Sequence, residues 1–501
     1  MSSSKSKKRK AIVVGAGIGG LSSSFELLNK GYQVTVIEAG DQPGGRARVF
    51  REKGYTFDAG PTVITAPYLF DELFDLVGER TEDWVKFVPI DPFYRILFDD
   101  GSEFDYVGDE DRLIENIRNI NPADVDGYRR LAKHAQEIFD VGYTELADKP
   151  FSTVASMLRV LPDMIRLQNY RSVYSLVSKY IQDERLRQAF SFEPLLVGGN
   201  PHKITSIYLL IHWLERKWGV HFAKGGTTAL INGLVGALTK HGVEFVYNCP
   251  VDSLQIEKGH VQRVYGGKGL HFDCDVLVSN TDPIKVYNEW VDEKWYPRRQ
   301  KQSVQKKSQS MSLFVSYFGT KKKYDNLVHH TILLGPRYKG LLDDIFTRKK
   351  LADDFSLYLH APTVTDSSLA PSGCEAFYVL SPVPNNKSGI PWDEIQGAYQ
   401  EKIFTSLEKR LLPGLKENLD VSFSVTPNYF EKDLRSTHGA AFGIEPSFQQ
   451  SAYFRFHNQS SEIKGLYFVG ANTHPGAGVP GVINSAKVLK RLVPQSEELP
   501  W

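Results

Sequence analysis

Residues 10–31 read KAIVVGAGIGGLSSSFELLNKG, and this stretch decides the fold. A short apolar strand runs into a turn with Gly15, Gly17, Gly19 and Gly20, which includes the GxGxxG spacing, and a helical pattern follows. Gly15 permits the tight turn, Gly17 lets the backbone approach a pyrophosphate, and Gly20 lets the helix pack closely on the strand. The free amides at the helix N-terminus favour an anion. The pattern therefore predicts a dinucleotide-binding α/β unit.

The next strand supplies an acid for the same ligand. QVTVIEAG (33–40) contains Glu38, which is placed to accept a hydrogen bond from a ribose hydroxyl. PGGRAR (43–48) follows, where Gly44 and Gly45 again allow close backbone approach and Arg46 can reach a phosphate. This second motif resembles that of FAD enzymes of the amine oxidase and phytoene desaturase superfamily. FAD is the expected cofactor.

GYTFDAGPTVIT (54–65) is predicted to be a strand that brings Asp58 and Gly60 near the flavin. The GxGxxG spacing recurs only in GAGVPG (476–481), which belongs to the C-terminal stretch 465–487 and not to a separate strand–turn–helix unit for a second dinucleotide. A bound nicotinamide donor is therefore not expected, and electrons must leave the flavin by another route.

The C-terminal stretch GLYFVGANTHPGAGVPGVINSAK (465–487) repeats the logic of strand, glycine turn and helix. The helix should begin near Pro480, because proline suits the first helical turn. Its N-terminus would stabilise negative charge on the reduced isoalloxazine, although a terminal helix packed on the sheet explains the pattern equally well. The flavin-contacting residues predicted here are Gly470, Thr473, His474, Gly478 and Val479.

Composition excludes several classes of protein. Sixty basic and fifty-nine acidic residues leave a net charge of +1, so no nucleic-acid partner is expected. Three scattered cysteines without a CxxC pair indicate reduced thiols inside a cell. The basic segment 1–10 is interpreted as a solvated tail without a secretory signal, and no apolar run is long enough to span a bilayer. The thirteen histidines, including His329 and His330, show no metal-binding motif, so no metal is expected.

Longer blocks carry a more specific resemblance. LRQAFSFEPLLVGGNP (186–201), FSLYLHAPTVTDSSLAP (355–371) and THPGAGVPGVI (473–483) are similar to the bacterial-type phytoene desaturases, which are FAD-dependent carotenoid enzymes. The resemblance implies successive desaturation of 15-cis-phytoene towards lycopene, with hydride transfer to flavin N5. It implies phytoene and desaturated carotenes as partners, and quinone or oxygen as the electron acceptor.

The expected fold is α/β, with a Rossmann-like FAD-binding domain, a mixed-sheet substrate domain and a helical membrane-associating subdomain. The FAD-binding domain should be discontinuous, because its motifs lie at both ends of the chain and a further strand pattern lies between them. The expected division is 1–95, 225–285 and 440–501 for this domain, 96–150 and 286–439 for the substrate domain, and 151–224 for the helical subdomain.

The helical subdomain contains amphipathic stretches with a basic edge. VASMLRVLPDMIRL (154–167) and VYSLVSKYI (173–181) present apolar stripes beside Arg159, Arg166, Arg171 and Lys179. Such a stripe can pack on a protein core or lie among lipid headgroups. The pattern alone favours the core, whereas the resemblance favours a peripheral position on the cytoplasmic face of a membrane.

Few residues are candidates for catalysis, because a hydrocarbon substrate has no polar group that a side chain could bind. Arg159 is a candidate for orienting charge near the flavin, and Asp58 and Glu193 are candidate proton acceptors. Each is equally compatible with a structural role. Alternatives remain open: another carotenoid oxidoreductase or isomerase, a ketolase or an amine oxidase on the same scaffold, or a non-catalytic isoprenoid-binding chaperone like those of prenylated small GTPases.

Overall fold

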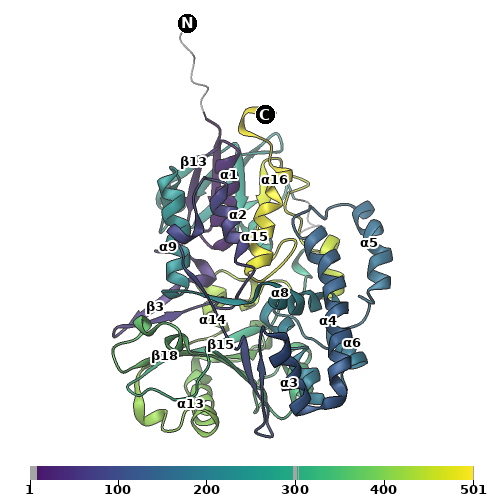
Figure 1. Cartoon of the computed structure of the whole chain (residues 1–501). Coiled ribbons are helices and arrows are strands. Elements are labelled where there is room, and N and C mark those ends of the chain that lie inside the picture. The colour runs from purple at the N-terminus through teal and green to yellow at the C-terminus, as the bar shows by residue number, and fades with distance from the viewer. Residues whose placement is uncertain (1–7, 297–301, 303, 500–501) are drawn as a thin grey trace.

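The computed structural model describes residues 8–296, 302 and 304–499 (Figure 1). Most of the predicted basic tail, residues 1–7, lies outside the described residues. Two lobes meet along the middle of the molecule, and a layer of helices lies against one side of both.

The first lobe is built on a five-stranded parallel sheet. Its order is β10 (Glu244–Val246), β2 (Gln33–Ile37), β1 (Lys10–Val14), β14 (Val276–Ser279) and β20 (Leu466–Phe468). Stretches far apart in the sequence therefore share one sheet. Helix α1 (Ile18–Asn29) packs beside it between two further helices, α9 (Gly226–Lys240) and α15 (Val479–Lys487).

Smaller elements complete this lobe. An antiparallel sheet of β11 (Val251–Glu257), β12 (His260–Gly266) and β13 (His271–Asp273) is inserted between β10 and β14. Two small sheets lie toward the second lobe: β3 (Val49–Glu52) with β4 (Tyr55–Asp58), and β9 (Val220–Ala223) between β5 (Ile64–Thr65) and β6 (Phe87–Pro89). Helices α2 (Tyr68–Asp75), α10 (Pro283–Lys285) and α16 (Leu489–Leu492) are also present.

The second lobe is a seven-stranded mixed sheet. Its order is β19 (Leu419–Val425), β15 (Ser312–Thr320), β18 (Glu375–Val383), β17 (Leu357–His360), β16 (His330–Leu333), β7 (Tyr94–Leu97) and β8 (Glu103–Tyr106). Only the β16–β7 pair is parallel. Every residue of β15 is buried, because α13 (Trp392–Arg410) covers one face of the sheet and the main core covers the other. Short helices α12 (Tyr338–Asp343) and α14 (Pro427–Lys432) flank it.

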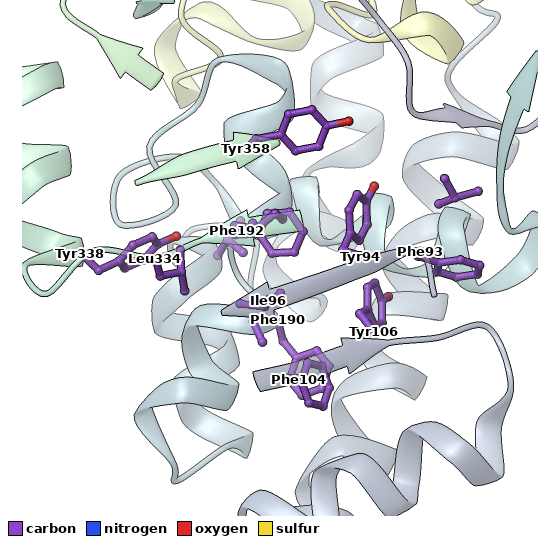
Figure 2. Packing of buried hydrophobic residues seen from close by; sticks show 14 of the residues in the cluster. Phe93, Tyr94, Ile96, Phe104, Tyr106, Phe190, Phe192, Leu334, Tyr338 and Tyr358 are labelled. Carbon is purple, nitrogen blue, oxygen red and sulfur yellow. The ribbon is translucent and has the colours of Figure 1, made fainter. Parts of the chain in front are cut away.

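The third part is helical and follows β8. It contains α3 (Glu110–Ile120), α4 (Val125–Phe139), α5 (Val154–Arg166), α6 (Val173–Tyr180), α7 (Glu184–Ala189) and α8 (Leu210–Trp218). An aromatic core joins it to the seven-stranded sheet, where Tyr94 and Tyr106 of the sheet meet Phe190 and Phe192 of the helical part (Figure 2). Helix α5 stands outermost and has no buried residue. Within the described residues, no helix has both the length and the apolar character needed to cross a bilayer.

Candidate active site: a glycine cradle that continues into an apolar cavity

A cavity of about 530 Å³ begins at the carboxyl ends of the parallel strands. The residues that follow β1, β2, β14 and β20 all line it: Gly15, Glu38, Asn280 and Gly470. Ligands of open parallel sheets bind at this edge. From there the cavity continues between the seven-stranded sheet and the helical part, where its wall is mainly apolar.

Two glycine turns form the cradle at the sheet edge. Gly17 and Gly44 form a β-bridge, and the amide of Gly44 donates to the carbonyl of Ala16 at 2.8 Å. A Cβ on Gly19 would lie 2.5 Å from Oδ1 of Asn280, so a side chain there would displace Asn280. Gly20 does not line the cavity, and a Cβ on it would lie 1.9 Å from the carbonyl oxygen of Gly15. Gly20 therefore allows the helix to pack closely on the strand.

Glu38 is held by backbone amides at the rim of the cradle. Its Oε2 accepts from the amide of Ala16 and its Oε1 accepts from the amide of Gly40, both at 2.8 Å. A carboxylate oxygen has a further lone pair. The carboxylate that lines the cavity therefore keeps acceptor capacity for a hydroxyl of a ligand.

Two arginines face the same space. Nη2 of Arg46 donates to Ser436 at 3.1 Å, but the buried Nε atoms of Arg46 and Arg48 have no hydrogen-bond partner among the described residues. Burial lowers the pKa of Arg46, and nearby Asp282 partly opposes this shift. Buried guanidinium groups with unused donors indicate an anionic ligand.

The C-terminal turn closes the cradle and leads into α15. Gly478 precedes the helix, Val479 is its first residue, and Pro480 stands in its first turn, as predicted. Gly470, Gly478 and Val479 line the cavity, whereas Thr473 and His474 do not.

The last two residues instead stabilise the turn from behind. Oγ1 of Thr473 donates to the carbonyl of Gly470, and the ring of His474 stacks on Phe151. Burial lowers the pKa of His474 to about 4. Arg455 donates to the carbonyls of Thr473 and Ala471, a brace that no sequence motif indicated.

Asp58 points away from the cavity. Its Oδ1 accepts from the amide and the hydroxyl of Thr227, at 2.8 and 2.9 Å, so the carboxylate caps the N-terminal turn of α9. Only 2% of Asp58 is exposed, and it is Gly60, two residues later, that lines the cavity. The helix cap takes one oxygen of its carboxylate, and the predicted position of Asp58 near the flavin stays a prediction.

The other two catalytic candidates do not line the cavity either. Glu193 is buried behind it, where Oε1 lies 3.3 Å from Nδ1 of His212 and burial raises the pKa of the carboxyl to about 8. Arg159 is exposed on α5 and does not line the cavity. Its predicted action on the flavin stays a prediction.

A carboxyl that was not predicted does reach the cavity. Glu215 on α8 lines the wall and is fully buried, and burial together with the neighbouring Glu193 raises its pKa well above the ordinary range. A cluster of hydroxyls from Thr62, Tyr358 and Tyr378 lies elsewhere on the wall, joined by hydrogen bonds of 3.1 and 2.6 Å. The sequence did not indicate these positions, because Glu215 stands where an amphipathic helix has its polar face, and the two tyrosines stand in strands of ordinary apolar pattern.

Comparison with known proteins agrees with this geometry. The family model described as flavin containing amine oxidoreductase matches residues 18–488. The chain belongs to this family. Phytoene desaturase (lycopene-forming) of Pseudescherichia vulneris is 47% identical over 97% of this chain and 99% of that protein. The protein of the same name from Pantoea ananas is 45% identical over 96% and 98%.

Among solved structures, putrescine oxidase bound to putrescine aligns with a TM-score of 0.64 at 16% identity, covering 97% of this chain and 99% of that chain. Identity this low supports only a shared fold. The predicted resemblance and the predicted α/β architecture with a mixed second sheet are confirmed.

The flavin of this amine oxidoreductase family fits the residues present, which confirms the predicted cofactor. The glycine cradle leaves room where a side chain would collide, and the free guanidinium donors suit a pyrophosphate. Residues that would hold FAD in this flavin oxidoreductase are Gly15, Gly17, Gly19, Glu38, Gly44, Gly45, Arg46, Arg48, Gly60, Gly470, Gly478 and Val479.

Proposed function

We propose that this chain is an FAD-dependent phytoene desaturase that converts 15-cis-phytoene to lycopene in successive steps. The observation that carries the proposal is the continuity of the cavity, which passes from the glycine cradle into an apolar space without an intervening wall. Two relatives with nearly full-length matches bear the name phytoene desaturase (lycopene-forming).

The apolar part of the cavity suits a linear hydrocarbon. Leu313, Val315 and Leu380 line it from the sheet, and Ile211 and Leu214 line it from α8. Each buried CH2 group contributes about 0.8 kcal/mol, so a long hydrocarbon can bind tightly without a polar contact. Recognition would then depend on the shape of the wall.

Bound flavin supplies the acceptor for a hydride from a CH2 group. The protein's own residues position the substrate and exclude water, because the wall beside the cradle is mainly apolar. Burial and the neighbouring Glu193 raise the pKa of Glu215 well above its ordinary range, which disfavours a fixed negative charge beside the hydrocarbon. The conjugated chain itself spreads the positive charge, and a protein base is helpful rather than obligatory. Quinone or oxygen would reoxidise the flavin.

Substrate would enter from a membrane surface along α5. Four large apolar side chains at helical spacing project from this helix, with exposed fractions of 43 to 62%: Val154, Leu158, Leu161 and Ile165. Arg159 and Arg166 accompany them on the exposed helix, which suits anionic headgroups. We call these six residues the α5 patch.

A second exposed apolar site adjoins the α5 patch. The segment 448–454 packs on α5 through Ala452–Phe454, and Phe448 and Phe454 are exposed by 44 and 42%. Ser451 in this segment contacts the hydroxyl of Tyr208, which lines the cavity. A lipid-dissolved substrate would therefore meet the cavity wall close to the docking surface.

The predicted division of the chain belongs to the same proposal. Residues 1–95, 225–285 and 440–501 would form the FAD-binding domain, 96–150 and 286–439 the substrate domain, and 151–224 the membrane-associating part. The five-stranded and seven-stranded sheets support the first two assignments.

The test is incubation of the FAD-loaded protein with phytoene-loaded liposomes, without nicotinamide, followed by chromatography and absorbance spectra of the products. A product with the spectrum of lycopene is expected. Unchanged phytoene beside an occupied flavin would contradict the proposal. Isomerised phytoene without net oxidation would indicate an isomerase, and a protein that refuses FAD yet retains the carotenoid would indicate a chaperone.

A further inference from the structure

Three histidines converge in the core between the two lobes. His329, His330 and His360 are exposed by 3, 0 and 0%, and one ring nitrogen of each lies within 4.8 Å of those of the other two. His330 and His360 face each other in the antiparallel β16–β17 pair, and His329 directly precedes β16. Since cross-strand partners project to the same face, the pairing holds the second and third rings together.

Some ring nitrogens of the three histidines have a hydrogen-bond partner and others have none. Nδ1 of His329 lies 2.6 Å from Oγ1 of Thr365, and Nδ1 of His330 lies 2.7 Å from the hydroxyl of Tyr358. Nε2 of both rings and both nitrogens of His360 lack a hydrogen-bond partner among the described residues. A buried polar atom without a partner costs about 1–3 kcal/mol, so four in one place need a common explanation.

A carboxylate completes the group. Oδ2 of Asp58 lies 3.7 Å from Nε2 of His360, beyond hydrogen-bond distance, and it also has no partner among the described residues. Its other oxygen is occupied by Thr227. Three imidazoles thus surround one buried point away from the cavity wall, and a carboxylate oxygen without a partner among the described residues lies beside the third ring.

We propose that His329, His330, His360 and Asp58 bind a divalent transition-metal ion of the Zn²⁺ class. Imidazole and carboxylate are its usual ligands, at about 2.0–2.2 Å in a tetrahedral arrangement. Nitrogens no more than 4.8 Å apart have a common centre about 2.8 Å from each, so a contraction of about 0.7 Å per ring gives the bonding distance.

The surroundings of the rings favour this assignment over ordinary core packing. Thr365 and Tyr358 can accept from the Nδ1 atoms, which fixes the tautomer that leaves Nε2 free, as outer partners of metal-bound histidines do. Burial lowers the pKa of all three histidines, and the neighbouring imidazoles lower those of His329 and His330 further.

The site would have a structural role. Four protein ligands leave no open coordination position, which is the mark of structural zinc. The ion would join β16 and β17 to the end of β4, and the residues after β4, including Gly60 and Thr62, line the cavity beside the cradle. The histidine spacing hid this arrangement, because the third ring lies thirty residues beyond the second and only strand pairing unites them.

The experiment uses untagged, FAD-loaded full-length protein expressed with added zinc. Elemental analysis should find about one metal ion per chain, and Co²⁺ substitution should give visible bands at longer wavelength than the flavin absorption. Chelator treatment should lower the melting temperature, and added Zn²⁺ should restore it. These readouts do not depend on the desaturase reaction.

Two variants and one control separate ligation from folding. Thr365→Val keeps the shape of the side chain but removes the partner of His329, so the affinity for Zn²⁺ should fall about 10- to 100-fold. His360→Gln should abolish stoichiometric binding, and His271→Gln, on the exposed face of β13, should leave it unchanged. A wild-type protein with no bound metal and no response to Zn²⁺ would overturn the proposal and identify the group as the site of a buried water.

Discussion

The hydroxyl of Tyr94 donates a 2.6 Å hydrogen bond to Oε1 of Glu215 on the wall of the cavity. Tyr94 comes from β7 of the seven-stranded sheet and packs against Phe192 of the helical part (Figure 2). The bond therefore ties the sheet to α8 at the point where substrate would lie. It also fixes on this wall a carboxyl whose pKa is raised by burial.

Glu215→Gln tests whether this carboxyl moves a proton. The amide keeps the size and the neutrality of the protonated acid, so we expect bound FAD to be unchanged and turnover of phytoene to stay within about threefold of wild type. Loss of about 100-fold or more with FAD still bound would contradict this expectation, since proton transfer by a side chain contributes on that scale.

Glu215→Leu is the companion variant. It leaves the buried hydroxyl of Tyr94 without its acceptor and should cost about 1–3 kcal/mol of stability, measured as a lower melting temperature. Tyr94→Phe in the same background should recover part of that loss, because it removes the unpaired hydroxyl.

Gly19→Ala tests the cradle. Its Cβ would meet Oδ1 of Asn280 at 2.5 Å and the Cα of Gly470 at 3.2 Å, so the Asn280 side chain must move and the backbone at Gly470 must give way slightly. We expect a cost of about 1–3 kcal/mol, which corresponds to about 5- to 150-fold weaker FAD binding. Flavin absorbance retained after desalting gives the measurement. Gly397→Ala in α13, where a Cβ meets nothing within 4 Å, should retain FAD fully.

The fold was predictable where local pattern and topology agree. The strand, glycine turn and helix at 10–31 place β1 and α1, and the C-terminal strand and turn place β20 and α15. The partnership of β7 with β16 was not predictable, because it joins residues more than two hundred positions apart by parallel pairing. Hydrophobic periodicity identifies a strand but not its neighbour.

The residues of the candidate site were likewise only partly predictable from the sequence. Glycines and Glu38 were identifiable because a dinucleotide demands close backbone approach at a fixed spacing. The role of Asp58 as a helix cap was not predictable, since an acidic residue at a strand end can cap a helix from elsewhere in the chain, here at Thr227 of α9. Glu215 was missed because one glutamate in LIHWLERKW reads as the polar face of an amphipathic helix. The burial of Glu215 depends on how α8 packs against the seven-stranded sheet.

The α5 patch gives a prediction about membranes. Leu158→Asp with Ile165→Asp exchanges two exposed apolar anchors for charges, so co-sedimentation with anionic liposomes should fall at least about tenfold. Melting temperature and bound FAD should stay unchanged, because neither side chain is buried in the protein. Leu270→Asp serves as the control, because Leu270 is an exposed leucine between β12 and β13 of the first lobe. Equal sedimentation of all three proteins would count against docking through α5.

Stability should fall with rising pH above about 6.5, and Glu193 is one cause. Burial raises the pKa of this carboxyl from 4.5 to about 8, so between these values only the unfolded chain releases the proton, and stability is lost as pH rises. His212, which lies 3.3 Å away, has its pKa lowered from 6.5 to about 3 by burial and the charge of Arg216, and it acts in the opposite direction below pH 6.5. The two effects oppose each other between pH 4.5 and 6.5.

From pH 6.5 to 8 the loss due to Glu193 is no longer offset by His212, and Glu215, with its raised pKa, adds to it. Glu193→Gln should remove a slope of up to about 1.4 kcal/mol per pH unit in this window. The measurement is the melting temperature of FAD-loaded protein at closely spaced pH values, with Glu52→Gln, an exposed carboxyl, as control. Identical slopes for wild type and Glu193→Gln would mean that Glu193 is ionised in the folded protein, and a buried negative charge would then stand behind the cavity wall.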